Sequence, residues 1–351
     1  MAVMVYKCPK CGAALEFDAE VQQMTCSYCG SMFTPQEALV GEVNVEPEDI
    51  REETPEQSEE FNAHLKAWHC PECGADIVAE ENVSATFCRF CGSPTLVETN
   101  LTGDYRPVSM IPFKISKEEA KSAFLKWCHN GRYTPKDFAS EQQLDKITGM
   151  YVPFWLFDCY VEGIGTGTGT KVRTWIHGDY QYVNTQYYKI LRRARMRYFR
   201  VPADGASAMD NEMMDALEPF DYDQLIRFDM PYLSGYMAEK YDESHKVVYP
   251  RIEQRVRQYT QQKLRTTISG YSNLNFQGQT NFQKVDACYS LLPVWMLTYR
   301  YKGQRYMFAM NGQTGKVVGH PPKSNKKVAL WSALYGAITF GSLFLLGGLL
   351  L

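Results

Sequence analysis

The sequence predicts a multi-domain fold: two small cysteine-rich units, an α+β domain with an antiparallel sheet, and one C-terminal transmembrane helix. Three observations lead to this prediction. Eight of the eleven cysteines fall in four Cys-x-x-Cys pairs, the middle of the chain alternates strand-like and helix-like apolar patterns, and the last twenty-four residues carry no charge. The predicted segments are the cysteine-rich units at 1–35 and 67–100, a flexible acidic linker at 36–66, the α+β domain at 101–322, and a basic flank with the transmembrane helix at 323–351.

The cysteine pairs form two copies of one unit, because fourteen residues separate the two pairs in each copy. Four thiolates from two short turns can bind one Zn²⁺ tetrahedrally. The predicted ligands are Cys8, Cys11, Cys26 and Cys29 in the first zinc ribbon, and Cys70, Cys73, Cys88 and Cys91 in the second. Four cysteines leave no position for water, so the two Zn²⁺ ions should be structural. Disulfides, a redox-active pair and rubredoxin-like iron are the alternatives.

The C-terminal segment 328–351 reads VALWSALYGAITFGSLFLLGGLLL, which is the length of a membrane span. Lys323, Lys326 and Lys327 precede it and predict that the preceding domains face the cytoplasm. No signal peptide is visible at the N-terminus. We therefore expect a single-pass protein of the cytoplasmic membrane, in a reducing compartment that favours zinc over disulfides.

Charge is distributed unevenly along the chain. Residues 1–61 hold three basic and thirteen acidic side chains, a net charge of −10, whereas residues 101–351 hold 32 basic and 22 acidic ones, a net charge of +10. Phosphate binding needs Lys and Arg on the contact face, so the acidic ribbons are expected to contact proteins and not nucleic acid. Residues 42–60 read as a flexible linker, with docking on the basic domain as the alternative.

The middle domain carries several local signals. Ser116 with Glu119 forms a capping box before a helix, and 244–267 predicts a longer helix. Residues 151–161 predict a buried strand, the glycine–threonine run 163–170 a loop or strand bend, and 291–301 with 305–311 a hairpin. Arg193, Arg195 and Arg197 alternate with less polar residues, which predicts a strand with a cationic outer face. That face is either simply solvated or binds anionic lipid or an acidic partner.

The sequence contains no recognised catalytic motif. A P-loop, HExxH, GxSxG and a paired-carboxylate pattern are all missing, and the six histidines are scattered. Cys159 and Cys288 lie in apolar strands and are expected to be small core residues. We expect no enzymatic activity.

Six segments are distinctive: CPKCGAALEF, TCSYCGS, CPECGADI, FCRFCGS, YVPFWLFD and LLPVWMLTYRYKGQRYMFAMNGQTGKVVG. Together they resemble a bacterial family, the YdjG-type proteins, which carry TFIIB-type zinc ribbons, an α+β domain and a C-terminal membrane segment. The resemblance implies partners of the phage-shock and flotillin-like types and a role in envelope stress. Relatives are often labelled primosomal protein N′ or replication-restart helicase, but this sequence holds no helicase motif.

The function expected from these features is that of a non-enzymatic, membrane-anchored adaptor that recruits proteins through its zinc ribbons. The alternative is a zinc-ribbon protein that binds nucleic acid in replication or restart, with the strand around Arg193 as the contact and no helicase activity. An unrecognised enzyme in 101–322 would need a pocket with convergent polar groups.

Overall fold

The computed structural model of the chain describes residues 8, 10–11, 13, 15–38, 65–80, 88, 97–99, 107–135, 137–138, 144 and 146–349. The chain divides into two compact units. Unit 1 comprises 1–153, 206–240 and 291–351, and unit 2 comprises 154–205 and 241–290. The predicted acidic linker 42–60 lies outside the described residues.

The first cysteine-rich unit is a small antiparallel sheet with the order β1-β2-β3. Its elements are β1 (Leu15–Asp18), β2 (Gln23–Cys26), β3 (Met32–Phe33) and the short helix α1 (Pro35–Ala38). The sheet is fixed to the rest of unit 1 by polar and aromatic contacts. The hydroxyl of Ser234 donates to the backbone carbonyl of Leu15 at 2.8 Å, and the rings of Phe17 and Tyr232 lie 4.8 Å apart.

The remaining strands form one mixed sheet of eleven strands, with the order β10-β7-β12-β8-β11-β5-β4-β6 and three strands off this path. Its first members are β4 (Leu65–His69), β5 (Asp76–Glu80), β6 (Val97–Thr99), β7 (Ser109–Met110), β8 (Thr148–His177) and β9 (Tyr180–Asp204). The others are β10 (Ile226–Arg227), β11 (Met237–Glu239), β12 (Asn273–Tyr301), β13 (Gln304–Asn311) and β14 (Val317–Gly319).

The predicted fold class is wrong in two respects that concern the sheet. The sheet is mixed, because β11 pairs in parallel with β8 and antiparallel with β5. The strands β4, β5 and β6 of the second cysteine-rich unit extend this sheet through β11. A short hairpin leaves unpaired backbone groups at its edge, and pairing with β11 satisfies them. The described chain is therefore mostly β-sheet.

Helix α3 (Lys117–Asn130) begins where its capping residues predict. The hydroxyl of Ser116 accepts from the backbone N–H of Glu119 at 3.3 Å, and the carboxylate of Glu119 accepts from the backbone N–H of Ser116 at 2.9 Å. Two otherwise unpaired N–H groups are thereby satisfied. Ala120, Phe124 and Cys128 are buried along one side of the helix. The predicted capping box is confirmed.

The core of unit 1 includes a cluster of aromatic rings around Phe113. The ring of Phe113 stacks on that of Tyr236 at 4.2 Å and meets the rings of Tyr151 and Trp295 edge-on at 5.1 Å each. The indole N–H of Trp295 donates to the carbonyl of Ile115 at 2.9 Å, so this large ring is buried with its polar atom paired. The short elements α5 (Asn211–Ala216), η1 (Tyr222–Gln224) and η2 (Met230–Leu233) complete the unit.

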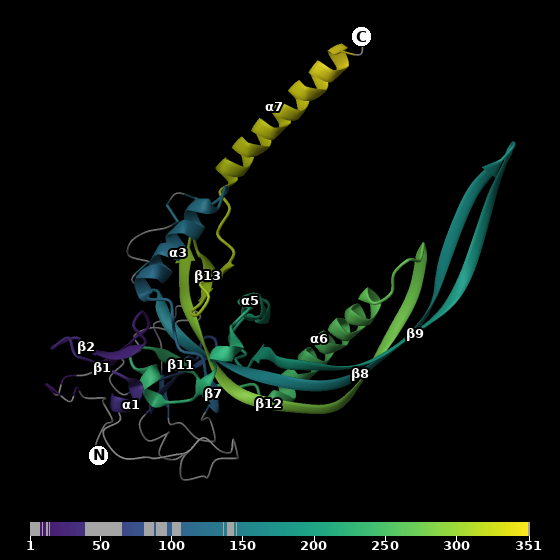
Figure 1. Cartoon of the computed structure of the whole chain (residues 1–351). Coiled ribbons are helices and arrows are strands. Elements are labelled where there is room, and N and C mark those ends of the chain that lie inside the picture. The colour runs from purple at the N-terminus through teal and green to yellow at the C-terminus, as the bar shows by residue number, and fades with distance from the viewer. Residues whose placement is uncertain are drawn as a thin grey trace. The chain divides into compact units, whose positions relative to one another are not determined.

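Unit 2 contains most of β8, all of β9, the first part of β12, and helix α6 (His245–Thr266). Figure 1 shows β8 and β9 as one long antiparallel ribbon with α6 alongside. Helix α6 buries one stripe of side chains at every fourth position: Val248, Ile252, Val256, Thr260 and Leu264. This spacing places them on one face of the helix. Leu264 packs in a cluster with Ile190 and Phe276 of the strands.

The glycine–threonine run, predicted as a loop or strand bend, is part of strand β8, so the prediction of a loop is wrong. Alternate residues of a strand share one face, and the glycines at 163, 165, 167 and 169 leave that face bare. A Cβ on Gly165 would lie 2.1 Å from the ring of Phe276, and one on Gly167 would lie 2.2 Å from the backbone oxygen of Asn275. The glycines are thus required because another part of the chain approaches closely.

Gly167→Val is therefore expected to destabilise the protein by about 1–3 kcal/mol, since the new side chain overlaps backbone that must move. Thr168→Val is the matched control, because Thr168 is exposed on the opposite face of β8. It should change the free energy of unfolding by less than about 0.5 kcal/mol. Urea unfolding of both variants checks this, and equal stability of the Gly167→Val variant would show that the close approach is absent.

The predicted transmembrane segment forms helix α7 (Asn325–Leu349). Among the residues that the structure describes, however, no helix is both long and apolar enough to cross a membrane. The predictions of a transmembrane helix and of a single-pass location in the cytoplasmic membrane are therefore wrong.

Candidate metal centre

The first cysteine cluster is built from two similar turns. Cys8 and Cys11 lie in a turn before β1, and Cys26 and Cys29 flank a turn that follows β2. Backbone N–H groups close both turns: that of Cys8 donates to Ala13 at 2.7 Å, and that of Cys26 donates to Ser31 at 2.9 Å. Gly30 has a φ of 67°, a conformation that glycine adopts without strain. The sequence thus folds locally so that both turns face each other.

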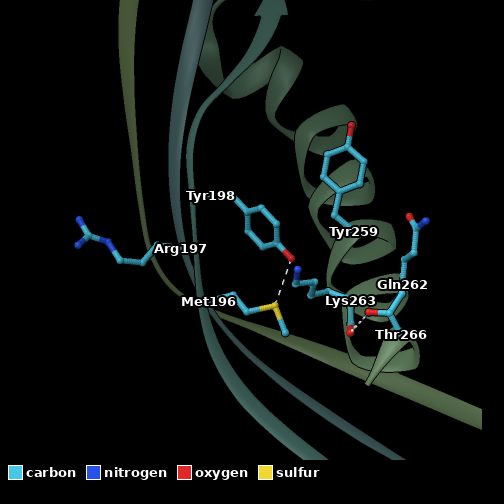
Figure 2. Close-up of a pocket in the computed structure, with 7 residues that line it drawn as sticks. All are labelled: Met196, Arg197, Tyr198, Tyr259, Gln262, Lys263 and Thr266. Atoms are coloured by element: carbon cyan, nitrogen blue, oxygen red, sulfur yellow. Dashed lines mark hydrogen bonds between the residues drawn. The ribbon is translucent and has the colours of Figure 1, made fainter. Parts of the chain in front are cut away.

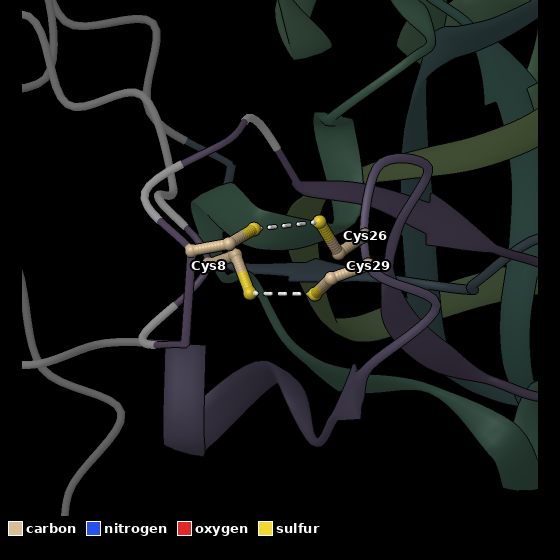
Figure 3. A group of neighbouring side chains, drawn as sticks. Cys8, Cys26 and Cys29 are labelled. Carbon is tan, nitrogen blue, oxygen red and sulfur yellow. Dashed lines mark hydrogen bonds between the residues drawn. The ribbon is translucent and has the colours of Figure 1, made fainter.

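The four thiols converge on a common point. The Sγ atoms of Cys8 and Cys29 lie 3.5 Å apart, as do those of Cys11 and Cys26, and all four Sγ atoms lie within 4.8 Å of one another. Figure 3 shows the side chains of Cys8, Cys26 and Cys29 directed toward one another. A disulfide needs about 2.05 Å between sulfurs. Four sulfurs at about 2.3 Å from one metal lie about 3.8 Å apart, so the cluster fits a tetrahedral metal site.

Burial and electrostatics distinguish the four thiols. Cys8 and Cys26 are buried, whereas Cys11 and Cys29 are exposed. Hydrogen bonding with the side chain of Ser31 lowers the pKa of Cys29 to about 6. For Cys11 a backbone hydrogen bond with Ala13 lowers the pKa, but desolvation and the neighbouring thiols outweigh it and raise the pKa to about 12. The metal-free cluster therefore resists full deprotonation, which a bound cation would reverse.

Acid is expected to release the metal. A thiolate that binds a metal has a folded-state pKa below its unfolded value, so its stabilisation is present at high pH and is lost as the pH falls through the folded value. Because the pKa of Cys29 is about 6 even without the metal, release should occur below about pH 6. Ser31→Ala should move release to higher pH, whereas Ser27→Ala on the same turn should not. A chromophoric chelator measures the free metal, and release on raising the pH would contradict this account.

The second cluster repeats this geometry. The Sγ atoms of Cys73 and Cys88 lie 3.6 Å apart, and Cys70 completes a group of three thiols within 4.8 Å of one another. The N–H of Cys70 donates to Ala75 at 2.9 Å, as that of Cys8 donates to Ala13 in the first cluster. The fourth predicted ligand, Cys91, lies outside the described residues. Both clusters could bind a metal ion.

The other described cysteines are not part of these clusters. Cys128 and Cys159 are buried, and burial raises the pKa of the Cys128 thiol to about 12 and that of Cys159 to about 11. Such thiols stay protonated at neutral pH and are poor nucleophiles. Cys288 is half-buried. Cys128 and Cys159 thus fill space in the core, as predicted for Cys159, whereas Cys288, predicted as a core residue too, is only half-buried.

Two exposed apolar side chains lie next to the first cluster and were not predicted as functional. Tyr28, between Cys26 and Cys29, is 82% exposed, and Met32 in β3 is 55% exposed. Sequence alone offers a weak signal for Tyr28, because an aromatic residue inside a tight Cys-x-x-Cys turn has few neighbours to cover it. Tyr and Met are also residue types enriched where proteins bind one another.

Comparison with known proteins finds a relative over nearly the whole chain. The chain is 37% identical over 342 residues to the uncharacterized protein YdjG of Bacillus subtilis (strain 168), and the alignment covers 96% of each protein. The chain belongs to the YdjG family. No family model matches the chain, and no solved structure matches it. Labels of the primosomal or helicase kind have no support from these comparisons.

Proposed function

We propose that this member of the YdjG family is a non-catalytic scaffold that binds other proteins, and that two structural Zn²⁺ ions shape its N-terminal contact surface. The convergence of four thiols in the first cluster carries the proposal. A donor set of four cysteines suits Zn²⁺ and leaves no open position for water or substrate. A metal held in this way supplies folding free energy to the ribbon. Cys70, Cys73 and Cys88, with Cys91, would hold the second ion.

The surface around the first cluster supports protein binding. We define the ribbon surface as Tyr28, on a turn that the metal would make rigid, and Met32, in the strand that follows this turn; both are exposed. Aromatic side chains lose little entropy on binding, and both aromatic residues and Met are enriched where proteins bind one another. Residues 8–38 contain four acidic side chains and one basic side chain, Lys10. That charge opposes phosphate binding and favours a protein partner over nucleic acid.

The family resemblance suggests which partners to test first, namely proteins of the phage-shock and flotillin-like types, with a role in envelope stress. Binding should depend on the ribbon surface and not on any catalytic group of this chain. We expect no turnover of a bound partner.

A capture experiment with the full-length protein tests the proposal. The double variant Tyr28→Ala with Met32→Ala should lose a defined partner by about tenfold, because its contact area is removed while the cysteines stay. The matched control is Tyr180→Ala with Val183→Ala, which removes similar exposed side chains from unit 2. Both variants should retain two metals. Partner amounts that are equal in both variants and the wild type would refute the proposal.

A further inference from the structure

Strand β9 lies at an edge of the sheet in unit 2. Its hydrogen-bonded partner is β8: the pairing begins with Asp204 opposite Phe154 and ends with Tyr180 opposite His177. Among the described residues no second strand pairs with β9. An edge strand presents backbone N–H and C=O groups that an additional strand can bind. Extended peptides use such edges for recognition, with main-chain hydrogen bonds for affinity and side-chain pockets for specificity.

One face of β9 carries three cations in a row. Arg193, Arg195 and Arg197 occupy alternate positions, so their side chains share a face at intervals of about 6.6–6.8 Å. The side chain of Arg193 is 65% exposed and that of Arg195 is 91% exposed. Glu162 of β8 lies 2.9 Å from Arg193 and 3.9 Å from Arg195. A single carboxylate therefore contacts two of these guanidinium groups and leaves the row positively charged.

Arg197 is held by aromatic rings. Its guanidinium carbon lies 4.4 Å from the ring centres of both Tyr160 and Phe199. One guanidinium N–H group donates to the hydroxyl of Tyr160 at 2.5 Å. The cation is thus fixed in place while the row stays exposed. Glu162 shows how a carboxylate on a neighbouring strand meets this row. It stands directly opposite Arg195, the position from which opposite charges pair across strands.

The other face of β9 borders a cavity. A cavity of about 540 Å³ is lined by Met196, Arg197 and Tyr198 of β9 and by Tyr259, Gln262, Lys263 and Thr266 of α6. The helix residues form a stripe at i, i+3, i+4 and i+7, beside the buried stripe of α6. Figure 2 shows Met196 and Tyr198 directed toward the helix and Arg197 directed to the opposite side of the strand. The cavity is large enough for one or two apolar side chains.

We propose that the groove between β9 and α6 binds an extended acidic segment of a partner protein, which adds as a strand along the edge of β9. Side chains of an added strand alternate between two faces. Its apolar residues enter the cavity beside Met196 and Tyr259, and its acidic residues meet Arg193, Arg195 and Arg197. This site lies within unit 2 and does not depend on the cysteine clusters or the ribbon surface. Either proposal can therefore be refuted without affecting the other.

The same residues fit a nucleic acid less well. Binding of single strands uses open aromatic faces on which bases stack. Here the guanidinium of Arg197 covers one face of each of the rings of Tyr160 and Phe199. The cavity beside the strand is bounded by the thioether of Met196 and by tyrosine rings, which suit apolar side chains, and by the ammonium of Lys263, which suits an acidic one. An alternating acidic and apolar peptide matches both faces of β9 at once.

Fluorescence anisotropy with the full-length protein tests the proposal. The probe is a labelled peptide of about eight residues with glutamate at alternate positions and leucine or valine between them. We expect binding that weakens with salt and falls by roughly tenfold in the variant Arg193→Glu with Arg195→Glu. Lys171→Glu with Arg173→Glu, an equal charge change at two exposed positions of β8 away from the cavity, should leave binding within about twofold. Thr266→Trp, which fills the cavity without changing charge, should also weaken it.

Hydrogen exchange separates strand addition from plain charge attraction. The bound peptide should slow exchange of backbone amides in 193–199, because the edge groups become paired. No binding up to about 1 mM peptide would overturn the proposal. So would equal binding of a peptide with lysine in place of glutamate, or binding without added protection of β9. The proposal would also be overturned if a single-stranded oligonucleotide bound more tightly than the peptide and the same variants abolished that binding. The ligand of this surface would then be a nucleic acid.

Discussion

Cys26→Ser is expected to remove one metal ion from each molecule and to unfold the sheet of β1, β2 and β3. Cys26 is buried at the end of β2, and its sulfur lies 3.5 Å from that of Cys11. Binding of structural zinc contributes on the order of 10 kcal/mol in small zinc-binding units, far more than three short strands can supply by themselves. Elemental analysis should show the loss of one metal, and hydrogen exchange should show loss of protection in 15–33.

Cys288→Ser is the control for this variant. Cys288 is half-buried and lies outside both cysteine clusters, so the metal content should not change. The hydrogen bonds of the remaining sheet should also keep their protection in the Cys26→Ser variant, because the larger sheet has its own core. A full metal content in Cys26→Ser would show that Cys26 is not a ligand.

Phe113→Ala is expected to destabilise unit 1 by about 3–5 kcal/mol. Phe113 is 0% exposed, and its ring contacts the rings of Tyr151, Tyr236 and Trp295. Removing it leaves a cavity among stiff aromatic side chains, which cannot close around the gap. Urea unfolding followed by tryptophan fluorescence measures the loss, because Trp295 lies at this site.

Phe340→Ala is a control with the same chemical change at a surface position. Phe340 lies on α7 and is 73% exposed, so its loss should change stability by less than about 0.5 kcal/mol. A loss below about 1 kcal/mol in Phe113→Ala would mean that the aromatic cluster does not organise unit 1.

Local signals in the sequence predicted local structure well. Ser116 and Glu119 predicted the start of α3, and the pattern of 244–267 predicted α6. The hairpin of β12 and β13 was also predicted, because Lys302-Gly303 is a turn signal between alternating apolar residues. Both residues have positive φ, at 50° and 80°. Each of these features is decided by residues that lie within a few positions of one another.

Features that depend on distant contacts were not predictable. The glycines of 163–169 resemble a loop until Asn275 and Phe276 are known to lie against them. The parallel pairing of β11 with β8 joins segments far apart in the chain, and nothing local encodes it. For the candidate site, cysteine spacing predicted which thiols converge, Cys91 lying outside the described residues, whereas the exposure of Tyr28 and the groove beside β9 appear only in the folded chain.

The zinc X-ray absorption spectrum of the purified full-length protein tests the central claim most directly. Two closed tetrads predict four sulfur neighbours per zinc at about 2.3 Å and no nitrogen or oxygen neighbour. Zinc with a mixed shell of sulfur and oxygen would reveal an open, chemically accessible position. That result, or a folded protein without bound metal, would contradict the account of a metal-shaped scaffold.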